Sequence, residues 1–129
     1  MRSRYGEAAA RFQERRQRER DAPRLLDDVP AILSLRLEVE ERRGSATLPE
    51  SKHIRHVVID QAPALLALVC GDTSCRHGGH DLTRDMLYHL RRGELDFVIE
   101  SACGGEVGTA YCSRVVRVCG SATYRPSPA

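Results

Sequence analysis

The chain has no tryptophan, only two phenylalanines and a single lysine among its 129 residues. Any hydrophobic core must therefore be built mainly from Leu, Val, Ile and Ala, and a small core of this kind leaves a modest stability margin. No stretch approaches the ~20 apolar residues of a membrane-spanning helix. The Arg-rich N-terminal segment also lacks the apolar run of an export signal. We therefore expect a cytoplasmic protein with no membrane segment.

The five cysteines cannot all pair with one another, which argues against a complete disulfide framework. Four of them form two spaced pairs, Cys70 with Cys75 and Cys103 with Cys112. In a small protein without an export signal, such pairs favour a metal site over disulfides. Structural zinc binds four such sulfurs, and in zinc-finger peptides it supplies roughly 10–16 kcal/mol. The pattern predicts a structural Zn²⁺ held by these four residues.

Two alternatives to the four-cysteine site stay open, because the spacings C-x4-C and C-x8-C are looser than the C-x2-C pairs of common zinc ribbons. In the first, His77 or His80 replaces one of the cysteines as a ligand. In the second, the four thiols are merely reduced and hold no metal. Cys119 has the parity of polar neighbours in its predicted strand, so we interpret it as a small residue and not as a ligand.

Apolar periodicity predicts an α+β domain of β-β-β-α-β-β order, with one helix packed on a mostly antiparallel sheet of about five strands. The expected strands cover about residues 32–41, 53–60, 65–70, 95–101 and 114–124, and the expected helices about 6–20 and 82–92. The domain organisation that follows is an Arg-rich helical arm and linker at 1–30, a zinc-stabilised domain at 31–124 and a disordered tail at 125–129.

The predicted strand directions bring the four cysteines to one rim of the sheet. The third strand ends at Cys70, the helix returns, and the fourth strand runs back to end beside Cys103. The fifth strand then starts from that same rim, just after Cys112. The N-terminus of the helix is expected at the rim as well, where its dipole would favour thiolates.

The N-terminal arm is the basic part of the chain. Residues 1–20 contain seven Arg and three Glu, a net charge of +4, so the remaining residues carry about −2 of the total +2. Arg is a good partner for phosphate and carboxylate groups. A nucleic-acid or acidic-protein partner is therefore one hypothesis, although interleaved Glu and few aromatics weaken it for RNA. The candidate contact residues are Arg11, Arg15, Arg16, Arg18 and Arg20.

The run C-G-D-x2-C-x2-G-G-H-D-L-T, from Cys70 to Thr83, is followed by Cys103 and Cys112. In this respect the chain resembles a group of small bacterial proteins for which no activity is established. The resemblance spans roughly residues 30–124. It implies that the cysteine run is one unit, and it implies no mechanism.

These patterns favour a non-enzymatic, zinc-stabilised binding or adaptor protein whose partner is RNA, the ribosome or an acidic protein. One alternative is a metal- or thiol-dependent enzyme that uses His77, His80 and Asp81 at the rim. The chain has neither H-E-x-x-H nor the motif of zinc deaminases, which weakens this alternative. A second alternative is a redox-responsive switch in which oxidation of the thiols ejects the metal.

Overall fold

The computed structural model describes residues 4–126, and within the first helix it describes the side chains of residue 10 and of residues 13–21. The elements along the chain are α1 (Arg4–Asp21), α2 (Leu25–Asp28), β1 (Ile32–Arg43), β2 (Ser51–His56), β3 (Ala67–Leu68), β4 (His80–Asp81), α3 (Thr83–Arg91), β5 (Asp96–Ala102), β6 (Glu106–Val107), β7 (Ala110–Tyr111) and β8 (Arg114–Tyr124). None of the helices in this part of the chain is both long and apolar enough to cross a bilayer.

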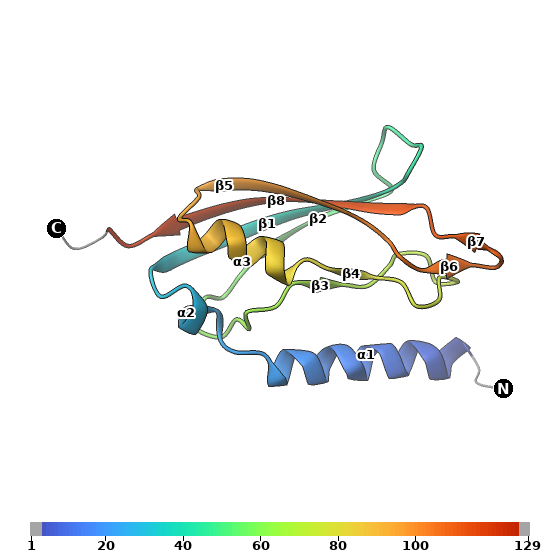
Figure 1. Cartoon of the computed structure of the whole chain (residues 1–129), viewed down its shortest axis with the longest axis horizontal. Helices are drawn as coiled ribbons and strands as arrows, with labels where there is room; N and C mark the ends of the chain where they lie inside the picture. Colours follow the sequence, from blue (N-terminus) through green and yellow to red (C-terminus); the bar gives the residue numbers. More distant parts are fainter. Residues whose placement is uncertain (1–3, 127–129) are drawn as a thin grey trace.

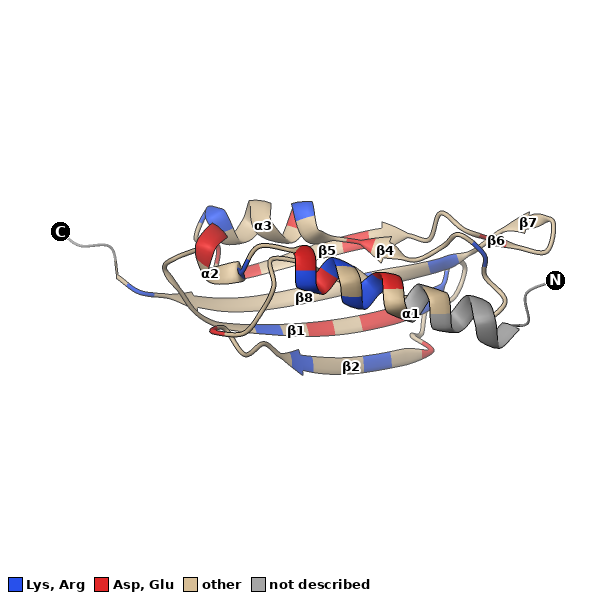
Figure 2. Ribbon diagram, turned by 90° about the horizontal axis from the view of Figure 1, so that it is seen from below, with Lys and Arg blue, Asp and Glu red and all other residues tan. Residues whose placement is uncertain are grey.

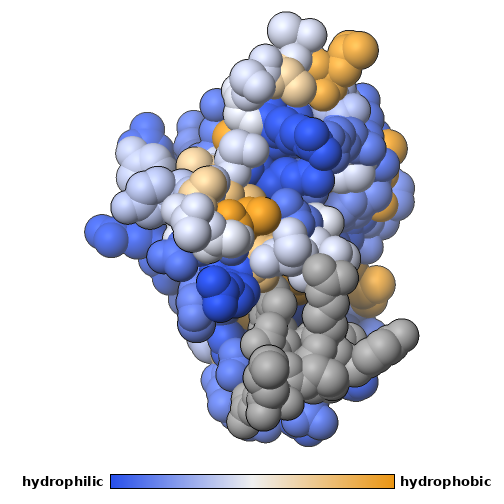
Figure 3. Space-filling view, turned by 90° about the vertical axis from the view of Figure 1, so that its right-hand side faces the viewer, coloured by the Kyte–Doolittle hydropathy of each residue, from blue (hydrophilic) through white to orange (hydrophobic). Residues whose placement is uncertain are grey.

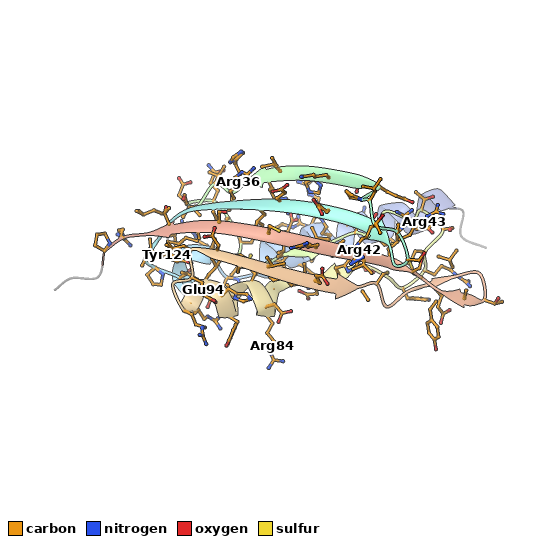
Figure 4. All side chains as sticks on the ribbon, turned by 90° about the horizontal axis from the view of Figure 1, so that it is seen from above. Arg36, Arg42, Arg43, Arg84, Glu94 and Tyr124 are labelled. Atoms are coloured by element: carbon orange, nitrogen blue, oxygen red, sulfur yellow. The ribbon has the colours of Figure 1, made fainter. Side chains whose placement is uncertain are left out.

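A four-stranded antiparallel sheet of order β2-β1-β8-β5 forms the upper layer of the molecule (Figure 1). The two long strands β1 and β8 pair along almost their whole length at its centre. Buried and exposed residues alternate along both, so one face is covered and the other meets solvent. Seen from above, the solvent face carries Arg36 and Arg42 of β1 (Figure 4). The predicted α+β class with a mostly antiparallel sheet is thus confirmed.

The covered face packs against α3, α2 and the chain between β2 and α3, which lie beneath the sheet (Figure 1). Helix α3 buries Met86, Leu87 and Leu90, as its periodicity predicts. It ends before Gly93, whose φ of +71° is the left-handed conformation that glycine adopts without strain. The Tyr124 hydroxyl donates to the Glu94 carbonyl at 2.7 Å and ties the end of β8 to this turn.

The apolar run at residues 65–70 forms only the two-residue strand β3, which pairs with β4 in a separate ribbon. The main sheet accordingly has four strands instead of about five. Hydrogen bonds explain the difference, because residues at the start of α3 already use the backbone of this segment. Leu66 N–H donates to Thr83 Oγ1 at 2.9 Å, and the Leu66 carbonyl accepts from Leu82 N–H at 2.8 Å.

One residue of β1 departs from the predicted alternation. Leu33 is expected on the buried side with Leu35, Leu37 and Val39, but it is 53% exposed, and Ile32 is buried in its place. The pairing register with β8 shifts between Ile32 and Ser34. A β-bulge of this kind inserts one residue and reverses the facing of those before it.

Candidate metal centre

The four paired cysteines meet at one end of the sheet, as the strand directions predict. Cys70 and Cys75 flank the turn after β3, Cys103 directly follows β5, and Cys112 lies between β7 and β8. Their sulfur atoms all lie within 4.8 Å of one another, and no disulfide joins them. Residues far apart in sequence therefore form one compact sulfur cluster that could hold a metal ion.

The sulfur spacing matches a tetrahedral ion. The Cys70 and Cys112 sulfurs are 3.7 Å apart, and so are those of Cys75 and Cys103. A regular tetrahedron with metal–sulfur bonds near ~2.3 Å has edges of about 3.8 Å. All four side chains are buried, none being more than 7% exposed. The donor set suits a soft, thiophilic metal better than an oxygen-preferring cation such as Mg²⁺.

Two glycines allow the loops to close around the sulfurs. A Cβ added to Gly78 would lie 2.4 Å from both the Cys75 and Cys103 sulfurs, and one added to Gly105 would lie 2.4 Å from the Cys75 sulfur. Neither position has room for a side chain. The short β6–β7 hairpin also encloses the sulfurs. The Arg76–Glu106 bridge links it to the loop that carries Cys70 and Cys75.

The pKa values of three thiols in the cluster are shifted, and they are not all shifted in the same direction. Burial raises the pKa of Cys70 well above its usual value, and burial together with hydrogen bonding to Cys103 raises the pKa of Cys75 to about 11. Burial acts the same way on Cys103, but hydrogen bonds from Gly79 N–H, Gly105 N–H and the Cys75 and Cys112 thiols together outweigh it and leave the pKa lowered. Gly79 N lies 3.3 Å from the Cys103 sulfur. These donors belong to loops, whereas the sequence predicts a contribution from the start of α3.

A buried carboxylate beside the cluster is absent from the residues predicted for the site. Glu41 of β1 is 7% exposed and accepts a hydrogen bond from Gly71 N–H at 2.9 Å. Arg114 Nη1 lies 3.5 Å from its other oxygen and also contacts Glu50. Glu41 therefore links the residue after Cys70 to the start of β8. The available signal was strand parity, since Glu41 continues the inward series of Leu35, Leu37 and Val39.

The two predicted histidine substitutes lie outside the group of four sulfurs. His80 is 4% exposed, and its Nδ1 is 3.1 Å from the Ser101 hydroxyl. Its Nε2 is buried and has no hydrogen-bond partner among the described residues. Burial lowers the pKa of His80, against a smaller opposing effect of Glu41. His77 is exposed and has a φ of +60° in the loop between Cys75 and Gly79.

The remaining predicted residues lie away from the sulfurs. Cys119 is in the middle of β8, opposite Val98 and Glu38, and half-buried on the solvent face. The Arg-rich helix α1 runs beneath the β3–β4 ribbon (Figure 1), and Arg18 Nη2 lies 2.5 Å from Asp81 Oδ2. The side chain of Arg11 lies outside the described residues.

Comparisons of the chain with protein-family models, with curated proteins and with solved structures find no match. They leave the resemblance of residues 70–83 to the bacterial group as a prediction. The functional assignment therefore depends on the sulfur cluster and its surroundings.

Proposed function

We propose that the protein is a binding module whose rim is held together by a structural Zn²⁺ on Cys70, Cys75, Cys103 and Cys112. The observation that carries the proposal is the pair of 3.7 Å sulfur–sulfur distances inside a fully buried group of four. Four thiolates fill the coordination sphere of tetrahedral zinc. A catalytic zinc normally keeps one position for water, which favours a structural role here over catalysis.

The surroundings of the cluster support the same choice. His80, the buried base nearest in sequence to the cysteines, is engaged with Ser101 of β5, between the β3–β4 ribbon and the sheet. The β6–β7 hairpin and the glycines beside the sulfurs bring backbone close around the proposed ion, as a structural site requires. A reducing compartment such as the cytoplasm, which we propose as the location, would keep the thiols ready for the metal.

The partner we propose is an acidic protein segment that binds α1. The described basic side chains of this helix are Arg15, Arg16, Arg18 and Arg20. They alternate with Glu14 and Glu19 (Figure 2), an arrangement that suits a patterned protein surface better than a uniform phosphate backbone. Seen end-on, the described surface combines hydrophilic and intermediate residues with scattered apolar ones (Figure 3).

The test of the metal is elemental analysis of protein purified without a metal-affinity tag. We expect one zinc per chain, and Co²⁺ substitution should give the intense thiolate absorption of four-sulfur tetrahedral sites. Cys112→Ser should lose the metal, and the matched control Cys119→Ser should keep it. Protein isolated without metal whose rim is nevertheless ordered, or a site with fewer than four sulfur ligands, would contradict the proposal.

The test of the partner is a pull-down from lysate with wild type and with a variant that carries Arg15→Gln, Arg16→Gln and Arg20→Gln. We expect the captured protein to be acidic and to be lost from the variant and at high salt, because exposed charges are screened. The control is Arg55→Gln in β2, which should retain it. Nuclease-sensitive capture would identify RNA instead, and capture unchanged by the α1 variant would contradict the assignment.

A further inference from the structure

A groove of about 330 Å³ lies between α1 and the cysteine loops. Glu14, Arg15 and Arg18 form its helical side. The opposite side includes His77 and the backbone of Gly78, Gly79 and Gly104, together with part of the β3–β4 ribbon. The groove therefore lies directly against the loops that carry the sulfurs, and α1 covers it.

Gly78 lies against both this groove and two of the sulfurs. Gly78 lines the groove, and the position of its missing Cβ is 2.4 Å from the sulfurs of both Cys75 and Cys103. No side chain fits there, so only backbone covers the two sulfurs at this position, which we call the glycine wall. Elsewhere the sulfurs are enclosed by the end of the sheet and by the β6–β7 hairpin. The glycine wall is thus the part of the cover that faces the groove.

Among the described side chains, the Arg18–Asp81 ion pair joins α1 to the β3–β4 ribbon, and a short segment joins the helix to α2. Arg18 and Asp81 approach to 2.5 Å, although both side chains are about half exposed. After Asp21 the chain passes through Ala22 and Pro23 to α2, whose first residue Leu25 hydrogen-bonds to Ala62. The C-terminal end of α1 is therefore anchored to the domain. An exposed ion pair contributes little free energy, so a partner can replace it.

From this arrangement we infer that α1 is a hinged cover of the metal centre and that the Arg18–Asp81 pair is its latch. An acidic segment that binds α1 competes with Asp81 for Arg18, lifts the helix and exposes the glycine wall to metal exchange. During that exchange the donor atoms of the acceptor replace the four sulfurs, and the released thiolates take up protons from water. The inference rests on the proposed zinc site and on the proposed partner of α1. It adds that partner capture controls the rate of metal exchange.

The experiment measures zinc transfer from the loaded full-length protein to the chromophoric chelator 4-(2-pyridylazo)resorcinol. Arg18→Gln should accelerate release about two- to five-fold, which is the effect expected from one exposed ion pair. Arg20→Gln removes the same charge from the same helix, but Arg20 hydrogen-bonds within the helix, to Gln17, so this variant is the matched control and should not change the rate. Raising the salt concentration should accelerate wild type and leave Arg18→Gln almost unchanged.

A charge swap separates the latch from a general effect on folding. Arg18→Asp should release zinc quickly, and Arg18→Asp combined with Asp81→Arg should restore slow release. An Arg18→Gln rate equal to wild type, or a swap that restores nothing, would overturn the inference.

If elemental analysis finds no zinc, the proposed function fails, and the cover is then tested on the thiols of the metal-free protein. Under the hinged cover, a disulfide reagent such as Ellman's reagent reacts faster with Arg18→Gln than with Arg20→Gln. Equal rates would show that α1 covers nothing.

Discussion

At the scale of single residues, the glycines beside the sulfurs allow a direct test of the enclosure. Gly78→Ala would force a methyl group against the Cys75 and Cys103 sulfurs, whereas a methyl group at Gly104, in the same rim, would meet no atom within 4 Å. We expect Gly78→Ala to lower zinc affinity by more than about tenfold, as disturbed metal surroundings do. Gly104→Ala should leave it within about twofold. Competition titration with a chelator measures both, and equal affinities would contradict the geometry.

Glu41 is the second residue with a sharp prediction. Its replacement by Ala leaves Gly71 N–H without its acceptor and Arg114 without one of its two carboxylates. A broken buried interaction of this kind costs about 2–4 kcal/mol of unfolding free energy. Glu40→Ala, one residue away on the solvent face, removes only a 3.5 Å contact with Lys52 and should cost less than about 1 kcal/mol. Urea unfolding compares the two, and similar losses would rule out a special role for Glu41.

Single residues could be placed from sequence where parity and spacing were enough. Parity alone sets Cys119 apart from the other cysteines, and the structure has it on the solvent face of β8. The same rule would have placed Glu41 on the inward face. An inward carboxylate does not predict a role, however, unless its partners are known, and its partner Arg114 is 73 residues away in sequence. Parity alone misplaces Leu33. A single bulge reverses the facing of the residues before it, and the pattern of apolar residues in the sequence does not reveal that bulge.

At the scale of elements, Gly120 of strand β8 lies directly opposite Phe97 of β5. A Cβ there would lie 2.2–2.6 Å from atoms of the Phe97 ring, which also stacks on the His89 ring. We expect Gly120→Ala to destabilise the sheet by about 1–3 kcal/mol, the usual cost of overpacking. Ser121→Ala, on the opposite face, is the control. Adding Phe97→Leu to Gly120→Ala should make the combined loss smaller than the sum of the two single losses, since the smaller side chain makes room. Additive losses would contradict the contact.

Strong elements could be predicted from sequence, and weak ones could not. The helical period of α3 and the alternation of β1 and β8 were sufficient to predict these elements, because each of them buries one face. The apolar character of residues 65–70 predicts a full strand there. The backbone of this run instead bonds to Thr83 and Leu82, and such competition between neighbours is invisible in local composition.

At the scale of the whole molecule, the described residues form two separate hydrophobic clusters. One joins the sheet to α3 and α2, and the other contains the four cysteines with Val107 packed against them. Chain order predicted that the sulfurs would meet, because successive strands start and end at the same rim. It could not predict that the main core is independent of them, since that depends on how the chain between β2 and α3 lies across the sheet.

This separation predicts how the protein responds to metal removal. We expect a strong chelator to loosen the rim, comprising residues 70–79 and 103–113, while the central strands β1 and β8 stay folded on their own core. Hydrogen exchange measured by mass spectrometry, with and without chelator, should show amide protection lost in those two segments and kept in β1 and β8.

The matched control for this measurement is Cys112→Ser without chelator. It removes one sulfur and should reproduce the same exchange pattern, because both treatments would take away the ion that we propose joins the loops. If chelation leaves the rim protected, the glycine-lined loops hold themselves together and the metal has no structural role. If chelation unfolds β1 and β8 as well, the two clusters form one cooperative unit, and the aliphatic core is too small to stand without the ion.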